Sequence, residues 1–251
     1  MRLQPLLDIA ALLVWGVLLL KFWLTGKMRI LLHPDYIWLA YSAGFFLVGL
    51  AIVKLVQFVV QVTQSKNRAK TPIAPPHFSL FPPGWGSALL LAVGLFGLQF
   101  TPQPFSSQVA LDRGVTDTLA LTRSQPQAFR AASLPETRSL VEWIRTLNIY
   151  PEPDAYAGQK VNLSGFAIHP PETPKDYLAI ARFVITCCAA DAYPIGLPVK
   201  LPGGDRSSYP PDQWFQVEGT MATETLNGKR QLVIQATSLK AIPEPASPYD
   251  Y

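Results

Sequence analysis

Long apolar stretches dominate the first 100 residues of the chain, and each is long enough, or nearly so, to cross a lipid bilayer. A membrane-spanning helix needs roughly 20 apolar residues. We therefore expect about three spans, at residues 6–24, 36–56 and 84–100. The last stretch, Trp85 to Phe100, is the shortest, at roughly 24 Å for a rise of about 1.5 Å per residue. The pattern predicts a transmembrane anchor over residues 1–100.

Lysine and arginine residues predict how this anchor is oriented. The segment SKNRAK after the second stretch holds three basic residues, and short basic loops favour the cytoplasmic side. With three spans, the amino terminus is expected in the cytoplasm and the C-terminal half outside it. If the short third stretch does not insert, the C-terminal half lies on the opposite side.

Residues 101–157 are expected to form a linker that contains one short amphipathic helix. The linker begins with TPQPFSSQ, a turn-rich composition. A helix is predicted over residues 134–149, because Leu140, Val141, Ile144 and Leu147 recur at helical spacing on one face. Ser133 and Glu136 are spaced as a capping box, which places the helix start there.

From residue 158 to residue 251 the apolar period becomes two, which predicts five strands. They are KVNLSGFAIH, LAIARFVITCC, IGLPVKL, WFQVEGTMA and RQLVIQATSL. In the first strand the apolar face switches at Gly165, which indicates a bulge or a strong bend. Five strands with a bent first one favour a small OB-like β-barrel, with a compact β-sandwich as the alternative. The expected fold class is thus a membrane-anchored α + β protein.

Composition supports the membrane assignment and separates the two halves of the chain. Charged residues make up 15% of the sequence and hydrophobic residues 49%, whereas soluble domains carry about 25% charged residues. The net charge of +4 comes from the first 100 residues, and the remainder has thirteen basic and fifteen acidic residues. A slightly acidic C-terminal half argues against nucleic-acid binding, which needs a basic surface.

Cys187 and Cys188 are the only cysteines of the chain, and they stand side by side where the second strand should end. Side chains alternate between the faces of a strand. A straight strand would therefore bury Cys187 and leave Cys188 accessible on the wetter face marked by Arg182. The two thiols can converge only if a turn starts at Cys188. The residues AADAYP favour such a turn, with Asp191 as its cap.

A soft metal ion is one possible occupant of this region. Structural zinc takes four ligands, mostly Cys and His, and the C-terminal half offers Cys187, Cys188, Asp191 and His169. A single reactive thiol and plain packing are the alternatives. The sequence contains no G-x-S-x-G, H-E-x-x-H, P-loop or G-x-G-x-x-G motif, so no enzymatic activity is predicted.

Three runs resemble the YcgQ-like family of bacterial membrane proteins: YAGQKVNLSGF, RFVITCCAADA and WFQVEG. The most specific element falls on Arg182, Cys187, Cys188, Ala190 and Asp191. The resemblance implies a multi-pass protein of the bacterial plasma (inner) membrane that is paired with a separate polytopic permease.

The leading functional hypothesis is therefore a non-enzymatic accessory subunit of a membrane permease, in contact with the lipid bilayer and not with nucleic acid. The alternative hypothesis is a soft-metal-binding or thiol-redox module that serves a transporter.

Overall fold

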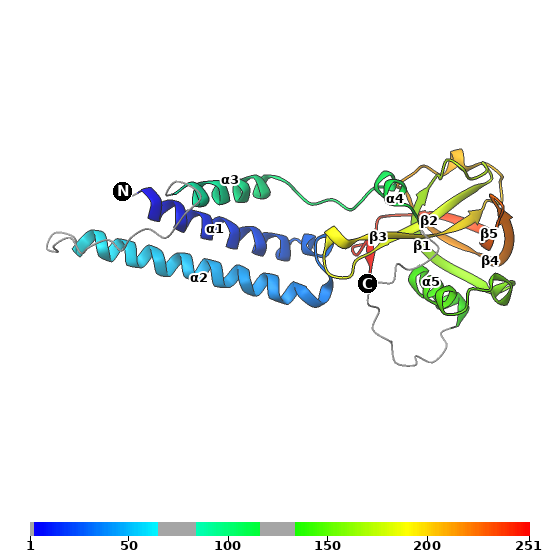
Figure 1. Ribbon diagram of the computed structural model, residues 1–251, viewed down its shortest axis with the longest axis horizontal. Coiled ribbons are helices and arrows are strands. Elements are labelled where there is room, and N and C mark those ends of the chain that lie inside the picture. Colours follow the sequence, from blue (N-terminus) through cyan, green and yellow to red (C-terminus); the bar gives the residue numbers. More distant parts are fainter. Residues whose placement is uncertain (1–2, 65–83, 116–133) are drawn as a thin grey trace. The chain divides into compact units, whose positions relative to one another are not determined.

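The computed structural model describes residues 3–64, 84–115 and 134–251. The chain divides into two compact units, Met1–Gln103 and Pro104–Tyr251, which are described separately below. Figure 1 shows that the described part of the first unit is helical, whereas strands form the body of the second.

In the first unit, residues 3–64 and 84–103 form three helices: α1 (Leu3–Leu24), α2 (Pro34–Gln64) and α3 (Trp85–Gln99), with the 3₁₀ turn η1 (Lys27–Ile30) between the first two. Two of them, α1 and α2, are long and apolar enough to cross a membrane, and only 17% and 11% of their apolar windows are buried. The third has 15 residues, about 22 Å at 1.5 Å per residue, which is shorter than a hydrocarbon core of about 30 Å. Two of the three expected spans therefore meet the length requirement.

Polar side chains fasten α3 to α1 at both ends. Asp8 accepts a hydrogen bond from the Ser87 hydroxyl at the start of α3. Lys21 donates to the carbonyl oxygen of Leu98 at 2.6 Å, near the C-terminal end of α3, where a cation is favoured by the exposed carbonyl groups. The residue numbers of both helices rise together along the contact, so α1 and α3 run parallel.

Small residues set the close approach of the helices within this unit. A Cβ at Gly94 would lie 2.7 Å from a methyl group of Val14, and one at Gly16 would lie 3.0 Å from the carbonyl oxygen of Gly44. Gly94 therefore packs closely against α1. Gly86, on the same helix, would meet nothing within 4 Å.

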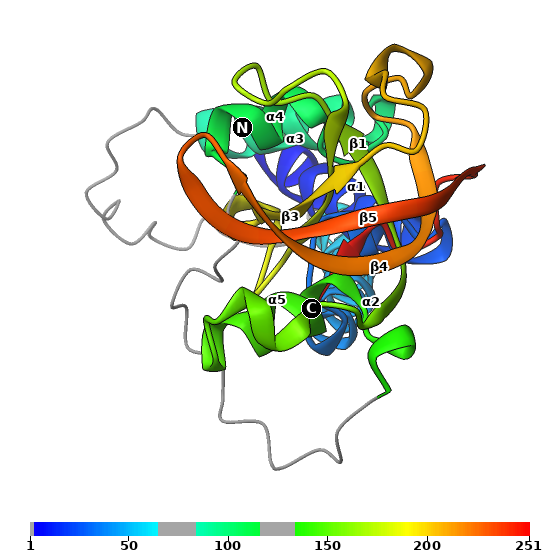
Figure 2. The ribbon, with the colours of Figure 1, turned by 90° about the vertical axis from the view of Figure 1, so that its right-hand side faces the viewer.

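The described residues of the second unit form six strands, two α-helices and several 3₁₀ turns. The strands are β1 (Lys160–Ile168), β2 (Tyr177–Val184), β3 (Tyr193–Lys200), β4 (Trp214–Leu226), β5 (Lys229–Ile242) and β6 (Tyr249–Asp250). The helices are α4 (Ser107–Arg113) and α5 (Leu140–Ile149), and the 3₁₀ turns are η2 (Pro135–Thr137), η3 (Pro153–Tyr156), η4 (Ala189–Asp191) and η5 (Arg206–Ser208). Figures 1 and 2 show α4 and α5 on opposite sides of the strands.

The strands form one mixed sheet in the order β1-β4-β5-β3-β2-β6, and β1 also pairs with β2. The neighbours are antiparallel except for β3 with β5, which share two residue pairs, and β2 with β6. Asn227 and Gly228 join β4 to β5 with φ values of 52° and 76°, the left-handed conformation of a tight hairpin turn. The sequence predicted five strands and missed β6, because a two-residue strand carries no periodic pattern.

Helix α5 starts six residues later than the sequence pattern suggested. Ser139 is its N-cap and forms a capping box with Glu142, so the assignment of the box to Ser133 and Glu136 is wrong; Ser133 lies outside the described residues. The apolar face was predicted correctly, since Leu140 and Ile144 are fully buried in the core. The sequence contains two S-x-x-E motifs that fit a capping box. The helix starts at the second one, which directly precedes the buried apolar face.

The two faces of β2 are both covered, which differs from the expected wet and dry faces. Leu178 and Ile180 lie on the face expected to be wetter, yet they are fully buried in the main core. Phe183, on the other face, packs against the rings of Phe105 and Phe166. The strand is therefore buried on both sides.

The burial of β1 changes at Gly165: alternate residues are buried before it, and Phe166, Ala167 and Ile168 are all buried after it. The strand pairs with β4 up to Phe166 and with β2 from Phe166 onward. A Cβ at Gly165 would lie 2.6 Å from the carbonyl oxygen of Ala181, so only glycine allows this approach of two backbones.

Substitution Gly165→Ala should lower the free energy of unfolding by roughly 1–3 kcal/mol, the usual cost of overpacking a rigid site. Gly203→Ala is the matched control, because a Cβ there would meet nothing within 4 Å. The measurement is denaturant unfolding of the full chain in mild detergent. Equal effects of the two substitutions would contradict the close approach at Gly165.

Candidate functional site

The turn that carries both cysteines is organised by one carboxylate. Strand β2 ends at Val184, and the following amides turn toward Asp191. Its Oδ2 accepts from the Cys187 N–H at 2.8 Å, and its Oδ1 accepts from the N–H groups of Thr186 and Cys188, both at 3.3 Å. The Thr186 hydroxyl also donates to Oδ2. The expectation that Asp191 caps the turn is confirmed.

The amide before these three is bonded by the neighbouring strand β6. Ile185 donates its N–H to the backbone oxygen of Asp250 at 3.1 Å, and Asp250 pairs with Val184 in the parallel β2–β6 ladder. The three amides that follow, from Thr186 to Cys188, are bonded by the Asp191 side chain and not by a strand. Buried or half-buried amides need such partners, and these partners allow the chain to leave the pleated conformation here.

The two thiols converge, which the strand pleat alone would prevent. The sulfur atoms of Cys187 and Cys188 lie 3.6 Å apart, and both cysteines are free. Cys187 is exposed and Cys188 half-buried, so the burial of Cys187 that a straight strand would give does not occur. The turn begins after Val184, and not at Cys188 as expected, so the alternation of faces has ended before the cysteines.

Asp191 also controls the protonation of the first thiol. A hydrogen bond to the Asp191 carboxylate, with a second contribution from Cys188, raises the pKa of Cys187 to about 12. For Asp191 itself, partial burial acts to raise the pKa. The hydrogen bonds from Thr186 and Cys187 outweigh it, so the pKa lies below the usual value. At neutral pH the site therefore pairs an ionised carboxylate with a protonated Cys187 thiol.

His169 does not join the cysteines. It follows Ile168, which pairs with Ala179 near the start of β2, and from there to Val184 the strand covers roughly 17 Å at about 3.3 Å per residue. Its Nε2 lies 2.8 Å from the carbonyl oxygen of Tyr209. No cluster of three or more Cys, His, Asp or Glu side chains with metal-binding geometry occurs in the described residues. The expected four-ligand set of Cys187, Cys188, Asp191 and His169 is therefore not assembled.

Arg182, the first residue of the family-like motif, holds the C-terminal strand. Its guanidinium forms an ion pair with Asp250, and the two side chains are only 14% and 15% exposed. It also lies over the ring of Trp214, 5.1 Å from the ring centroid. Burial raises the pKa of Asp250, although Arg182 opposes that shift. This pair was not predicted from the sequence, because the two residues are 68 positions apart.

Ala190, the remaining residue of that motif, lies in the 3₁₀ turn η4 and is exposed. The turn runs from Ala189 to Asp191, with Cys188 as its N-cap. Its two alanines carry no polar group, so Ala190 contributes a short side chain and no chemistry. The functional groups of the turn are the two thiols and the carboxylate.

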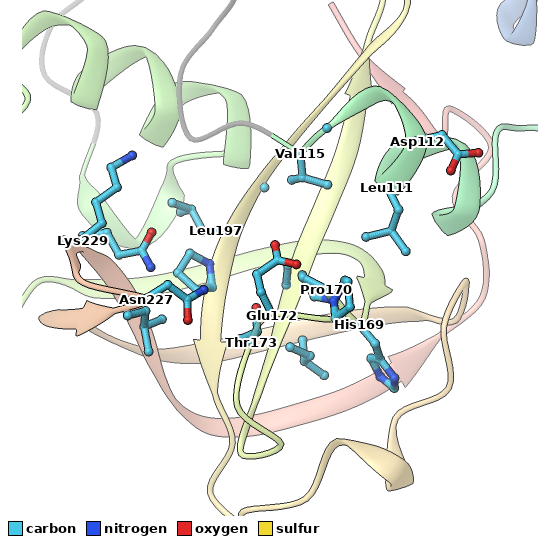
Figure 3. Close-up of a pocket in the computed structure, with 18 of the residues that line it drawn as sticks. Leu111, Asp112, Val115, His169, Pro170, Glu172, Thr173, Leu197, Asn227 and Lys229 are labelled. Atoms are coloured by element: carbon cyan, nitrogen blue, oxygen red, sulfur yellow. The ribbon is translucent and has the colours of Figure 1, made fainter.

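A second candidate site is a groove of about 740 Å³ on the β2–β3 side of the second unit. Its floor includes Leu178 and Leu197, and its rim comes from α4, the β1–β2 loop and the β4–β5 hairpin. Figure 3 shows Glu172 near the middle of the lining, with Asp112 and Lys229 toward opposite ends. The volume suits a small molecule. Sequence patterns did not predict the groove, because five separate segments build it.

The edge of β3 beside this groove resists the addition of another strand. Pro194, Gly196 and Pro198 occupy alternate positions of β3, while β5 pairs with β3 only at Val199 and Lys200. In an antiparallel pair, every second residue directs its N–H to the neighbouring strand. Proline has no N–H, so the positions of Pro194, Gly196 and Pro198 are the set that faces away from β2, toward the open edge. Two prolines leave Gly196 as the only donor among the three. Such an edge protects against sheet extension.

Comparison with known proteins places these features in a family. The DUF1980 N-terminal domain matches residues 7–116, and the DUF1980 C-terminal domain matches residues 136–251. UPF0703 protein YcgQ of Bacillus subtilis (strain 168) is 30% identical over 105 residues. The chain belongs to the YcgQ-like (DUF1980) family. No solved structure matches it.

The aligned region covers 41% of this chain and 36% of the length of YcgQ. In this YcgQ-like chain, the dithiol turn (residues 185–191) and the Arg182–Asp250 pair both fall within the DUF1980 C-terminal domain. The N-terminal domain covers α2, α3 and all but the first four residues of α1.

Substitution Asp191→Asn should make the Cys187 thiol react faster. The experiment compares Cys188→Ser with Cys188→Ser, Asp191→Asn, so that only Cys187 is alkylated. Loss of the carboxylate brings the pKa of Cys187 down from about 12, so alkylation at pH 8 should accelerate at least about ten-fold, since the thiolate is the nucleophile. Asp205→Asn is the control, because Asp205 caps a different turn through Ser207. Equal rates in all variants would refute control by Asp191.

Substitution Asp250→Ala should lower the free energy of unfolding by roughly 3–5 kcal/mol, because it leaves the buried Arg182 without its partner. Hydrogen exchange at the Ile185 amide should also accelerate. That amide donates to the backbone oxygen of residue 250, and loss of the ion pair with Arg182 loosens the strand that carries this oxygen. The control is Asp154→Ala, which removes the exposed pair with Arg230 and should matter far less because water screens it. An unchanged unfolding midpoint for Asp250→Ala would contradict this role.

Proposed function

We propose that this chain is a non-enzymatic accessory subunit of a bacterial membrane permease, and that it presents an OB-like β-barrel at the extracytoplasmic surface. The observation that carries the proposal is the pairing of two exposed apolar helices with a separate β unit. Such an architecture holds a folded domain next to a membrane partner.

The strand pairings support the OB-like barrel. β1 pairs with β2, β2 with β3, β3 with β5, β5 with β4, and β4 again with β1. This cyclic sequence of pairings is that of a five-stranded Greek-key barrel of the OB type, in which one junction is partly open. Here the short parallel junction between β3 and β5 is the open one, and β6 lies outside the ring.

The anchor supports a multi-pass topology with the β unit outside the cell. Phe45 and Phe46 are 56% and 69% exposed on α2, which suits contact with lipid or with the helices of another protein. α3 runs parallel to α1, so a third crossing would place the β unit opposite the amino terminus. The polar contacts of Asp8 and Lys21 with α3 favour its insertion beside α1, because they satisfy polar groups within the helix bundle.

Structural contacts occupy the charged groups that an enzyme would use, which supports a non-enzymatic role. Arg182 pairs with Asp250, and Asp191 holds the turn amides. Glu224 accepts hydrogen bonds from Lys200 at 3.0 Å and from the Tyr177 hydroxyl. The groove, over its described lining, has no Phe, Tyr or Trp side chain, so it lacks the large aromatic rings on which OB folds stack bases.

A second candidate function is a soft-metal-binding or thiol-redox module that serves the permease. One observation favours it: the sulfur atoms of Cys187 and Cys188 lie 3.6 Å apart at an accessible turn. A dithiol at that separation can share one metal ion or exchange with a disulfide.

Purification of the tagged chain in mild detergent should recover a polytopic permease in constant proportion, because the exposed helices need a protein partner for the proposed role. Untagged membranes are the control. A lone monomer at several detergent strengths would count against the accessory-subunit proposal.

Membrane-impermeant maleimide should label Cys188 in intact cells that express the Cys187→Ser variant, since the β unit is proposed to lie outside. Permeabilised cells give the full labelling level, and the Cys187→Ser, Cys188→Ser variant gives the background. Labelling that appears only after permeabilisation would place the β unit in the cytoplasm and contradict the proposed topology.

A further inference from the structure

The distance between the sulfur atoms of Cys187 and Cys188 favours ions of one coordination geometry over another. Two thiolates on a tetrahedral zinc-type ion, with bonds of about 2.3 Å, lie about 3.8 Å apart. A linear ion with bonds of the same length needs about 4.6 Å between the sulfurs. The two metal-free thiols lie 3.6 Å apart, in hydrogen-bond contact. A tetrahedral ion therefore needs the sulfurs to separate by only about 0.2 Å, whereas a linear ion needs about 1 Å.

We propose that Cys187 and Cys188 form a bidentate site for a thiophilic divalent ion of tetrahedral preference, the class of Zn²⁺ and Cd²⁺. The proposal rests on the second candidate function and specifies its cargo. The protein supplies two ligands, and water or a donor group of a partner fills the other two positions. An incomplete coordination sphere suits an ion that is passed on, because closed four-ligand sites retain their metal.

The turn holds this geometry before an ion arrives. Asp191 fixes the N–H groups of Thr186, Cys187 and Cys188, and Asp250 fixes that of Ile185. Little backbone freedom remains to be lost on binding, which favours affinity. The exposed side of Cys187 leaves room for the two outer ligands.

Binding is written as an exchange of protons for metal. Two S–H bonds break, two metal–sulfur bonds form, and two protons leave to the solvent, with no change of oxidation state. The hydrogen bond between the Cys187 thiol and Asp191 is given up, while the carboxylate keeps its contacts with the amides. Affinity must therefore fall as the solution becomes more acidic.

Cadmium titration of the reduced full chain in mild detergent at pH 8 tests the proposal. We expect one Cd²⁺ per chain, with a thiolate-to-cadmium charge-transfer band in the ultraviolet. Cys187→Ser and Cys188→Ser should each weaken binding by at least about 100-fold, because each removes the gain from two linked ligands. Asp205→Asn, which changes a different turn, should have no effect.

The outcomes separate this inference from the function on which it rests. Tight binding of Ag⁺, which accepts linear coordination, without Cd²⁺ binding would preserve a thiol-based metal site and overturn the tetrahedral assignment. Binding of neither ion would overturn the metal-binding function as well. Cd²⁺ binding that survives both serine substitutions would show adventitious sites and would also overturn the proposal.

Discussion

The carboxylate of Asp191 is the constraint on which the dithiol turn depends. It accepts three consecutive N–H groups, from Thr186 to Cys188, which have left the sheet ladder. Backbone amides at the edge of a core need partners, and a single side chain three residues beyond Cys188 provides them. Without this carboxylate the chain would keep its pleat, and the two thiols would point to opposite sides.

The neighbouring contacts extend this constraint into the core of the β unit. Ile185 donates to the backbone of Asp250, whose side chain forms a buried ion pair with Arg182. Tyr249 packs against Phe105 and Phe183 beside this pair. The cysteine turn is thus held on one side by its own cap and on the other by the C-terminal strand. Of the motif residues, Arg182 and Asp191 therefore stabilise the turn, and Cys187 and Cys188 are the residues that the turn carries.

Sequence patterns predicted the features that depend on local periodicity. They located the apolar helices, the buried face of α5 and five of the strands. They did not predict which cysteine is exposed, because that depends on β2 ending at Val184. They also missed the Arg182–Asp250 pair, since its partners are 68 positions apart and no local pattern links them. The cap of Asp191 was predictable, because it lies within the same short turn.

Nuclear magnetic resonance of the Thr186, Cys187 and Cys188 amides during an acid titration tests the role of Asp191 most directly. If the carboxylate binds all three, their resonances shift together with the Asp191 carboxyl carbon. The common midpoint should lie below the usual aspartate pKa of 3.8. Amides that do not follow the carboxyl carbon, or a midpoint at or above the usual value, would contradict this account of the turn.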